Sequence, residues 1–128
     1  MFDWRRPDNL GVKDGRLAPC RRTPNCVSSQ ADPADREHYV DAIPFRGDAM
    51  TAVRKAVEAL PRTTIISSTS NYLYAEFRSK LLGYVDDVEF FFDGNVIQVR
   101  SASRLGRRDF GVNRSRVEQL RRLIKPTP

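Results

Sequence analysis

Histidine and cysteine are scarce in this sequence, which has one histidine and two cysteines in 128 residues. Cys20 and Cys26 are separated by five residues, and this spacing fits neither a redox C-x-x-C motif nor a zinc knuckle. We therefore expect no metal site and no cofactor. The pair fits either a structural disulfide that closes a short loop in an oxidising compartment, or two reduced thiols in the cytosol. We favour the second state, with small buried thiols.

Long apolar segments are also lacking. No run approaches the roughly 20 apolar residues of a membrane span, so we expect no spanning segment. The opening residues MFDWRRPDNLGVKDGRLAPC hold no apolar core of the kind found in signal peptides, and we expect a cytoplasmic location. The length, with 40% hydrophobic and 30% charged residues, predicts one globular domain.

Positive charge is concentrated near the C-terminus. The formal net charge is +6, and residues 104–125 hold eight basic residues against Asp109 and Glu118, so this segment carries the whole net charge. A local basic field favours anionic partners such as phosphate, nucleic acid or an acidic membrane surface. The alternative is a basic helix face that contacts only water.

The pattern of apolar residues predicts an α+β domain over residues 38–125, preceded by an irregular N-terminal arm over 1–37. Four prolines and several glycines interrupt any hydrophobic period in the arm. We expect a short edge strand within 38–45 and four further strands over 62–69, 71–79, 83–92 and 95–103. We also expect two helices, one over 47–61 with Asp48 as N-cap and one over 113–124 with Asn113 or Ser115 as cap. The short connections predict a four-stranded antiparallel meander with both helices on one face.

The last two strands form a hairpin around Asp93-Gly94-Asn95, and the alternation of side chains assigns its two faces. Val88, Phe90, Phe92, Ile97 and Val99 fall on the core face. The other face gathers charged residues and tyrosines: Asp87, Glu89, Arg100 and Arg104, with Tyr72, Tyr74, Glu76 and Arg78 from the preceding strand. We interpret Asp87, Glu89 and Arg100 as surface ion pairs, worth roughly 0.2–1 kcal/mol each.

Asp86 falls on the core face, where a carboxylate needs a partner. Asn113 and Arg114 are the candidates. Asp86 is either a buried tie between the hairpin and the second helix, or an acid–base group acting with Asp87 and Glu89. No nucleophile, histidine or metal cluster stands beside these acids in the sequence, which favours the tie.

The segment SRLGRRDFGVNR, residues 103–114, joins the last strand to the second helix. A helix N-terminus binds anions through its free N–H groups and its dipole. Arginine side chains add forked donors that suit phosphate or carboxylate. The residues predicted for such an anion site are Arg100, Arg104, Arg107, Asn113 and Arg114.

Three blocks, PNCVSSQ (24–30), YVDDVEF (84–90) and VRSASRLGRRDFGVNRSRVEQLR (99–121), resemble the bacterial and plant family known as domain of unknown function 1499. The likeness covers about residues 18–124. It implies that the polar residues of the blocks form one constellation with Cys26 nearby, but it supplies no activity, cofactor or substrate. Members often carry an aromatic residue where this chain has Arg107, and some relatives are exported or membrane-tethered, which weakens the cytoplasmic expectation.

Three functional interpretations follow. The first is a small binding domain that holds an anionic small molecule, or an acidic group of a protein partner, at the Arg-rich strand-to-helix loop. The second is an enzyme in which Asp86, Asp87 or Glu89 acts as acid or base, and the third is a purely structural scaffold protein. Nucleic-acid binding ranks last because the interleaved acids repel phosphates.

Overall fold

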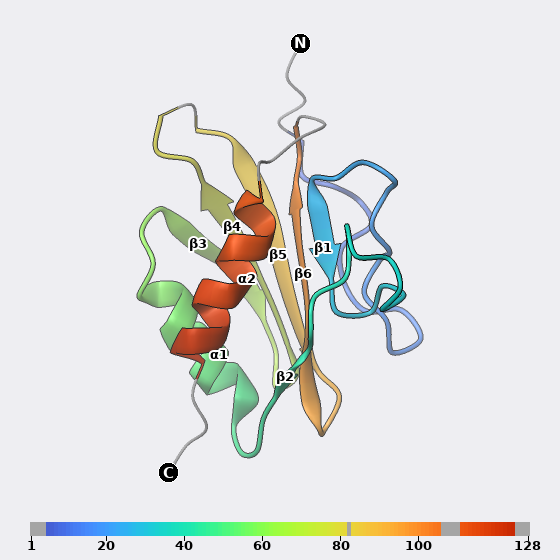
Figure 1. Ribbon diagram of the computed structural model, residues 1–128. Coiled ribbons are helices and arrows are strands. Elements are labelled where there is room, and N and C mark those ends of the chain that lie inside the picture. Colours follow the sequence, from blue (N-terminus) through green and yellow to red (C-terminus); the bar gives the residue numbers. More distant parts are fainter. Residues whose placement is uncertain (1–4, 82, 106–110, 125–128) are drawn as a thin grey trace.

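The computed structural model describes residues 5–81, 83–105 and 111–124. In chain order the elements are β1 (Cys26–Ser28), β2 (Ile43–Pro44), α1 (Ala49–Glu58), β3 (Thr63–Ser68), β4 (Tyr72–Arg78), β5 (Val85–Phe92), β6 (Val96–Ser103) and α2 (Val112–Leu123). This arrangement confirms the α+β class with a mostly antiparallel sheet. Both helices lie in front of the sheet in Figure 1, and the arm lies around its β1–β6 edge.

The sheet of the described residues has six strands, two more than the predicted meander. Its order is β1-β6-β5-β4-β3, with β2 also paired to β6. The predicted meander corresponds to β3–β6. β1 comes from the arm and pairs with β6 from Cys26↔Ala102 to Ser28↔Arg100, and β2 pairs at Ile43↔Ile97. β2 lies within the edge strand expected over 38–45. β1, with three residues, is too short to produce a detectable alternation, so the sequence shows no period there.

The hydrophobic core lies between the helices and one face of the sheet. Asp48 caps α1 as predicted, because its carboxylate accepts from the Thr51 N–H at 3.2 Å. Val53 of α1 and Leu120 of α2 pack in one cluster with Phe90 of β5, and all three are fully buried. Burying such side chains stabilises the fold by roughly 1.5–3 kcal/mol each.

The hairpin register confirms the predicted faces. β5 and β6 pair antiparallel, with Phe90 opposite Val99 on the core face and Glu89 opposite Arg100 on the other. We call this second face of β4, β5 and β6 the outer face. Residue parity predicts these faces correctly because every pair in this hairpin keeps one register from end to end.

The predicted cap of α2 is wrong. The helix begins at Val112 after Gly111, whose φ of 78° is a conformation that glycine adopts without strain. The Ser115 N–H already bonds to the Gly111 carbonyl within the helix. Asn113 points into the core, where its amide donates to the Ser103 hydroxyl at 2.8 Å. A fully buried amide must find hydrogen-bond partners, and in this structure it finds them in the sheet.

Candidate functional site

The charged residues of the outer face are buried. Asp87, Glu89 and Arg100 are only 2%, 0% and 6% exposed. The prediction of surface ion pairs is therefore wrong, because the N-terminal arm covers this face. The Gly11 N–H donates to Glu89 Oε2 at 2.7 Å, and the Pro19 carbonyl accepts from Arg100 Nη2 at 3.4 Å. The arm thus supplies polar groups where the sequence pattern suggested water.

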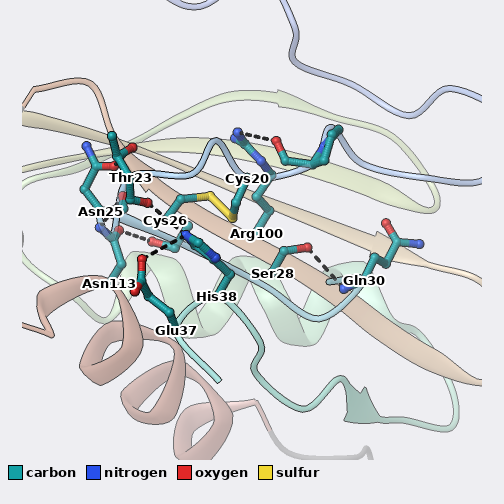
Figure 2. Close-up of a disulfide and its surroundings, with 12 residues drawn as sticks. Cys20, Thr23, Asn25, Cys26, Ser28, Gln30, Glu37, His38, Arg100 and Asn113 are labelled. Atoms are coloured by element: carbon teal, nitrogen blue, oxygen red, sulfur yellow. Dashed lines mark hydrogen bonds and ion pairs between the residues drawn. A yellow bond between two sulfur atoms is a disulfide. The ribbon is translucent and has the colours of Figure 1, made fainter. Parts of the chain in front are cut away.

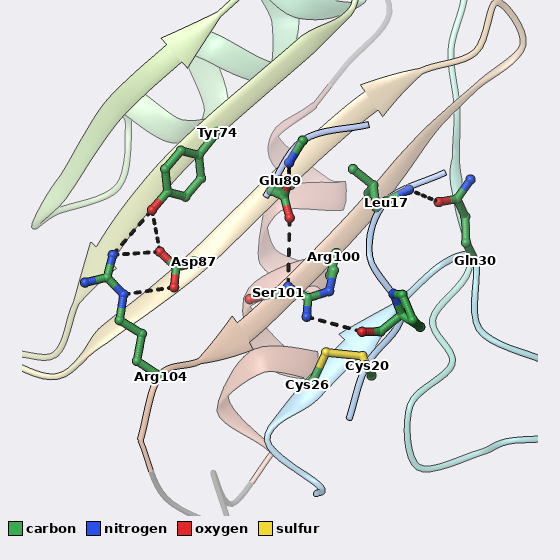
Figure 3. Close-up of polar contacts among 12 residues, drawn as sticks. Leu17, Cys20, Cys26, Gln30, Tyr74, Asp87, Glu89, Arg100, Ser101 and Arg104 are labelled. Carbon is green, nitrogen blue, oxygen red and sulfur yellow. Dashed lines mark hydrogen bonds and ion pairs between the residues drawn. A yellow bond between two sulfur atoms is a disulfide. The ribbon is translucent and has the colours of Figure 1, made fainter. Parts of the chain in front are cut away.

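Arg104 lies at the centre of a buried network on the outer face (Figure 3). Its guanidinium makes two hydrogen bonds of 2.9 Å to Asp87 and one of 2.6 Å to Glu76. The Tyr74 hydroxyl also donates to Asp87. The bonds to Asp87 and Glu76 raise the pKa of Arg104 above its ordinary value. Each charge in this network has a close partner of opposite sign.

Glu76 forms ion pairs with two arginines, Arg104 and a second one from the arm. Arg6 contacts Glu76 Oε2 at 3.0 Å through both Nε and Nη2. Burial opposes ionisation of Glu76, but hydrogen bonds from Arg6 and Arg104 outweigh it and lower the pKa of this carboxyl. The arm therefore helps to keep a buried glutamate charged.

The Glu89–Arg100 ion pair has longer contacts and fewer hydrogen bonds than the ion pairs of Arg104. The two residues face each other across the strands, yet Arg100 Nη1 and Glu89 Oε1 are 3.8 Å apart. Tyr72 donates to Glu89 Oε2 at 2.6 Å, while Glu89 Oε1 and Arg100 Nε have no hydrogen-bond partner among the described residues. Burial raises the pKa of Glu89 and lowers the pKa of Arg100. Arg100 is a buried cation with incomplete compensation.

A cavity of about 620 Å³ lies between the arm and the outer face. This volume falls in the range of small-molecule sites. Among the described residues, its lining includes five arginines and two aspartates, namely Arg5, Arg6, Arg21, Arg100, Arg104, Asp8 and Asp87. We call this cavity the arm pocket. Its lining is strongly basic.

Arg21 brings a second uncompensated charge to the arm pocket. It is exposed and forms no hydrogen bond or ion pair within the described part of the chain. Burial is the main cause of the lowered pKa of Arg100, and the nearby Arg21 charge lowers it further. A disulfide joins Cys20 and Cys26 next to Arg100 (Figure 2), so the structure has the disulfide and not the favoured pair of reduced thiols.

Asp86 lies on the opposite side of the sheet from the arm pocket. Its carboxylate pairs with Arg116 Nη1 of α2 at 2.8 Å, and this guanidinium also stacks over the Phe77 ring at 5.0 Å. Arg114 is a predicted partner of Asp86, but it donates instead to three backbone carbonyls between β1 and β2, those of Arg36, Glu37 and Tyr39. Asp86 therefore ties β5 to α2.

The structure divides the predicted anion site. Arg100 and Arg104 lie together in the arm pocket, whereas Asn113 and Arg114 belong to α2 on the core side. Arg107 lies outside the described residues. The carboxylates are divided as well, because Asp87 lines the arm pocket, whereas Glu89 is fully buried opposite Arg100 on the paired strand.

Sequence reasoning missed the arm's contribution to the pocket. Arg5, Arg6 and Arg21 line it, although they lie in a segment without periodicity. The available signal was the pair of Arg-Arg dipeptides at 5–6 and 21–22. Within residues 5–81, 83–105 and 111–124, no three His, Cys, Asp or Glu side chains gather in a way that could hold a metal ion.

Fold and site together define a small α+β domain whose N-terminal arm covers the charged face of a mostly antiparallel sheet. The chain belongs to the family described as Protein of unknown function (DUF1499), whose family model matches residues 16–124. The resemblance seen in the sequence is thereby confirmed. No curated protein and no solved structure matches the chain. In the part of the chain that the structure describes, no helix is long and apolar enough to cross a membrane.

Proposed function

We propose that this protein is a binding domain for a small anion, or for an acidic group of a partner, and that the arm pocket holds that group. The observation that carries the proposal is Arg100, a buried guanidinium that lines the pocket and that makes, among the described residues, only one long hydrogen bond, to Pro19. A buried charge without full compensation is costly unless something else supplies the partner. An anion in the pocket would supply it.

The other pocket arginines support a division of labour. Arg6 and Arg104 are engaged with Glu76 and Asp87, and they serve mainly to hold the outer face together. Within residues 5–81, 83–105 and 111–124, Arg21 and Arg100 have no such carboxylate at hydrogen-bond distance. Guanidinium groups bind carboxylate and phosphate oxygens through paired N–H donors. The ligand class is therefore a carboxylate or a phosphate.

The proposed site differs from the one expected at the α2 N-terminus. The arm pocket reaches the start of the strand-to-helix loop at Ser103 and Arg104. A contribution from Arg107 stays a prediction. Three arginines of α2, Arg114, Arg116 and Arg121, bind carbonyls and carboxylates of this chain, which supports the low rank given to nucleic-acid binding.

The test is calorimetric titration of the purified oxidised protein with inorganic phosphate and with citrate. Arg21→Ala should weaken binding by about tenfold or more, since a hydrogen bond to a charged group contributes roughly 1.5–3 kcal/mol. Arg22→Ala is the matched control, because Arg22 is also exposed and does not line the pocket. Equal losses in both variants would indicate nonspecific attraction to positive charge.

A thermal-shift measurement provides an independent readout. An anion at about 100 times its dissociation constant should stabilise the protein by roughly 2.7 kcal/mol. The proposal would be refuted if phosphate, citrate and a wider panel of sugar acids and nucleotides caused neither a thermal shift nor a heat of binding. That result would favour the structural scaffold. Turnover of a panel member with loss in Asp87→Asn would favour the enzyme.

A further inference from the structure

The disulfide loop, residues 20–26, forms one wall of the arm pocket. Four lining residues lie in it: Arg21, Thr23, Asn25 and Cys26. Figure 2 shows the disulfide beside Arg100, whose hydrogen bond goes to the carbonyl of the residue that precedes Cys20. The covalent link and the least compensated cation of the outer face are therefore neighbours.

The two ends of this loop are held in different ways. At its C-terminal end, the Asn25 carbonyl accepts from the Ser103 N–H at 2.9 Å and from the Asn113 amide at 3.2 Å. The Thr23 carbonyl lies 2.9 Å from His38 Nε2. These bonds fasten the loop to β6, to α2 and to the segment before β2, and none of them involves sulfur.

The N-terminal end of the loop has far fewer ties. Among the described residues, hydrogen bonding of residues 18–22 consists of the 3.4 Å bond from Arg100 to the Pro19 carbonyl. Arg21 and Arg22 are exposed, and neither makes a hydrogen bond to another described residue. The disulfide is thus the principal tie that keeps Arg21 close to Arg100, and it does so against the repulsion of two like charges.

We propose that anion binding in the arm pocket requires the oxidised Cys20–Cys26 pair, so that the redox state of these cysteines controls the affinity of the site. This inference rests on the proposed function. Reduction by a dithiol transfers two electrons and two protons: the S–S bond breaks, two thiols form, and the reductant becomes a disulfide. Residues 18–22 then lose their covalent tie and Arg21 moves away from Arg100, while Thr23 and Asn25 keep their bonds.

The experiment is phosphate titration of the full chain before and after reduction with dithiothreitol. Reduction should lower the affinity about tenfold, the same loss expected for removing Arg21. The Cys20→Ser/Cys26→Ser double variant should bind like the reduced protein and should not respond to dithiothreitol. In Arg21→Ala, reduction should cause little further loss, because both changes remove the same contact.

The outcomes separate the two proposals. Absence of phosphate binding by the oxidised protein would refute the proposed function itself. Equal affinity of oxidised and reduced protein would leave the anion site standing and overturn its redox control. Near-ultraviolet circular dichroism serves as the folding control. A loss of that signal on reduction would also overturn the inference, since the effect would then be global unfolding instead of a local release of residues 18–22.

Discussion

Replacing Arg104 by methionine tests whether the outer face is held together by its buried charges. Methionine keeps much of the length of the side chain, so the main change is the loss of the guanidinium. That guanidinium bonds Asp87 and Glu76 at 2.6–2.9 Å, and the Arg104 side chain is only 6% exposed. Removing one partner of such a buried pair costs roughly 3–5 kcal/mol.

This loss is large for a chain of 128 residues. Total stabilities of domains are about 5–15 kcal/mol, so the variant should lose roughly a fifth or more of its stability. Urea denaturation of the oxidised protein measures the loss directly. In a thermal melt, the midpoint should fall by on the order of 10 °C.

The pH dependence of the same variant checks the cause. Arg104 helps to lower the folded-state pKa of Glu76, so the contribution of this glutamate is present above its ordinary value of 4.5 and is lost as the pH falls through the folded pKa. The variant lacks part of that contribution at pH 7. The stability gap between wild type and Arg104→Met should therefore narrow towards pH 3.

The control is Arg54→Met on α1. Arg54 and Glu58 form an exposed pair at 3.6 Å, and pairs of this kind contribute roughly 0.3–0.5 kcal/mol. If Arg104→Met cost no more than this control at pH 7, the buried network would not be a structural element. Arg104 would then have to be counted with Arg21 and Arg100 as a cation available to ligands.

Two further predictions concern the seam between arm, sheet and α2. Asn113→Ala should lower the free energy of unfolding, measured by urea denaturation, by about 3 kcal/mol, because the Ser103 hydroxyl and the Asn25 carbonyl each lose a buried hydrogen-bond partner. A loss below about 1 kcal/mol would contradict this. Burial disfavours protonated His38, but its contacts with the Thr23 carbonyl and Asp35 prevail and raise its pKa above 6.5. Stability should therefore fall as the pH rises through that raised pKa, and His38→Gln should remove this slope; an unchanged slope in the variant would show that another group titrates.

The sequence predicted the parts of the fold that depend on local periodicity. β4, β5 and β6 alternate cleanly, so their core and outer faces followed from residue parity alone. α1 carried both a capping aspartate and a helical stripe. The start of α2 was misjudged because Asn113 and Ser115 resemble caps, and only the packed structure shows the amide of Asn113 bonding to the sheet.

Burial of the outer face was not predictable in the same way. A strand face of charged residues has the same pattern whether it meets water or a polar covering segment. The arm covers it largely through backbone groups, such as the Gly11 N–H and the Pro19 carbonyl, and these leave no signature in the side-chain pattern. The pocket, which exists only between the two layers, was hidden for the same reason.

The covering arm also sets an order of events during synthesis. Its contacts with the sheet join residues 70, 78 and 81 positions apart, between Arg6 and Glu76, Gly11 and Glu89, and Pro19 and Arg100. At about 5–20 residues per second, the arm leaves the ribosome roughly 4–16 s before its partners exist. Cys20 and Cys26, only 6 positions apart, are free to join during that interval. The arm residues are thus made before the strands that they cover, and they can dock only after those strands exist.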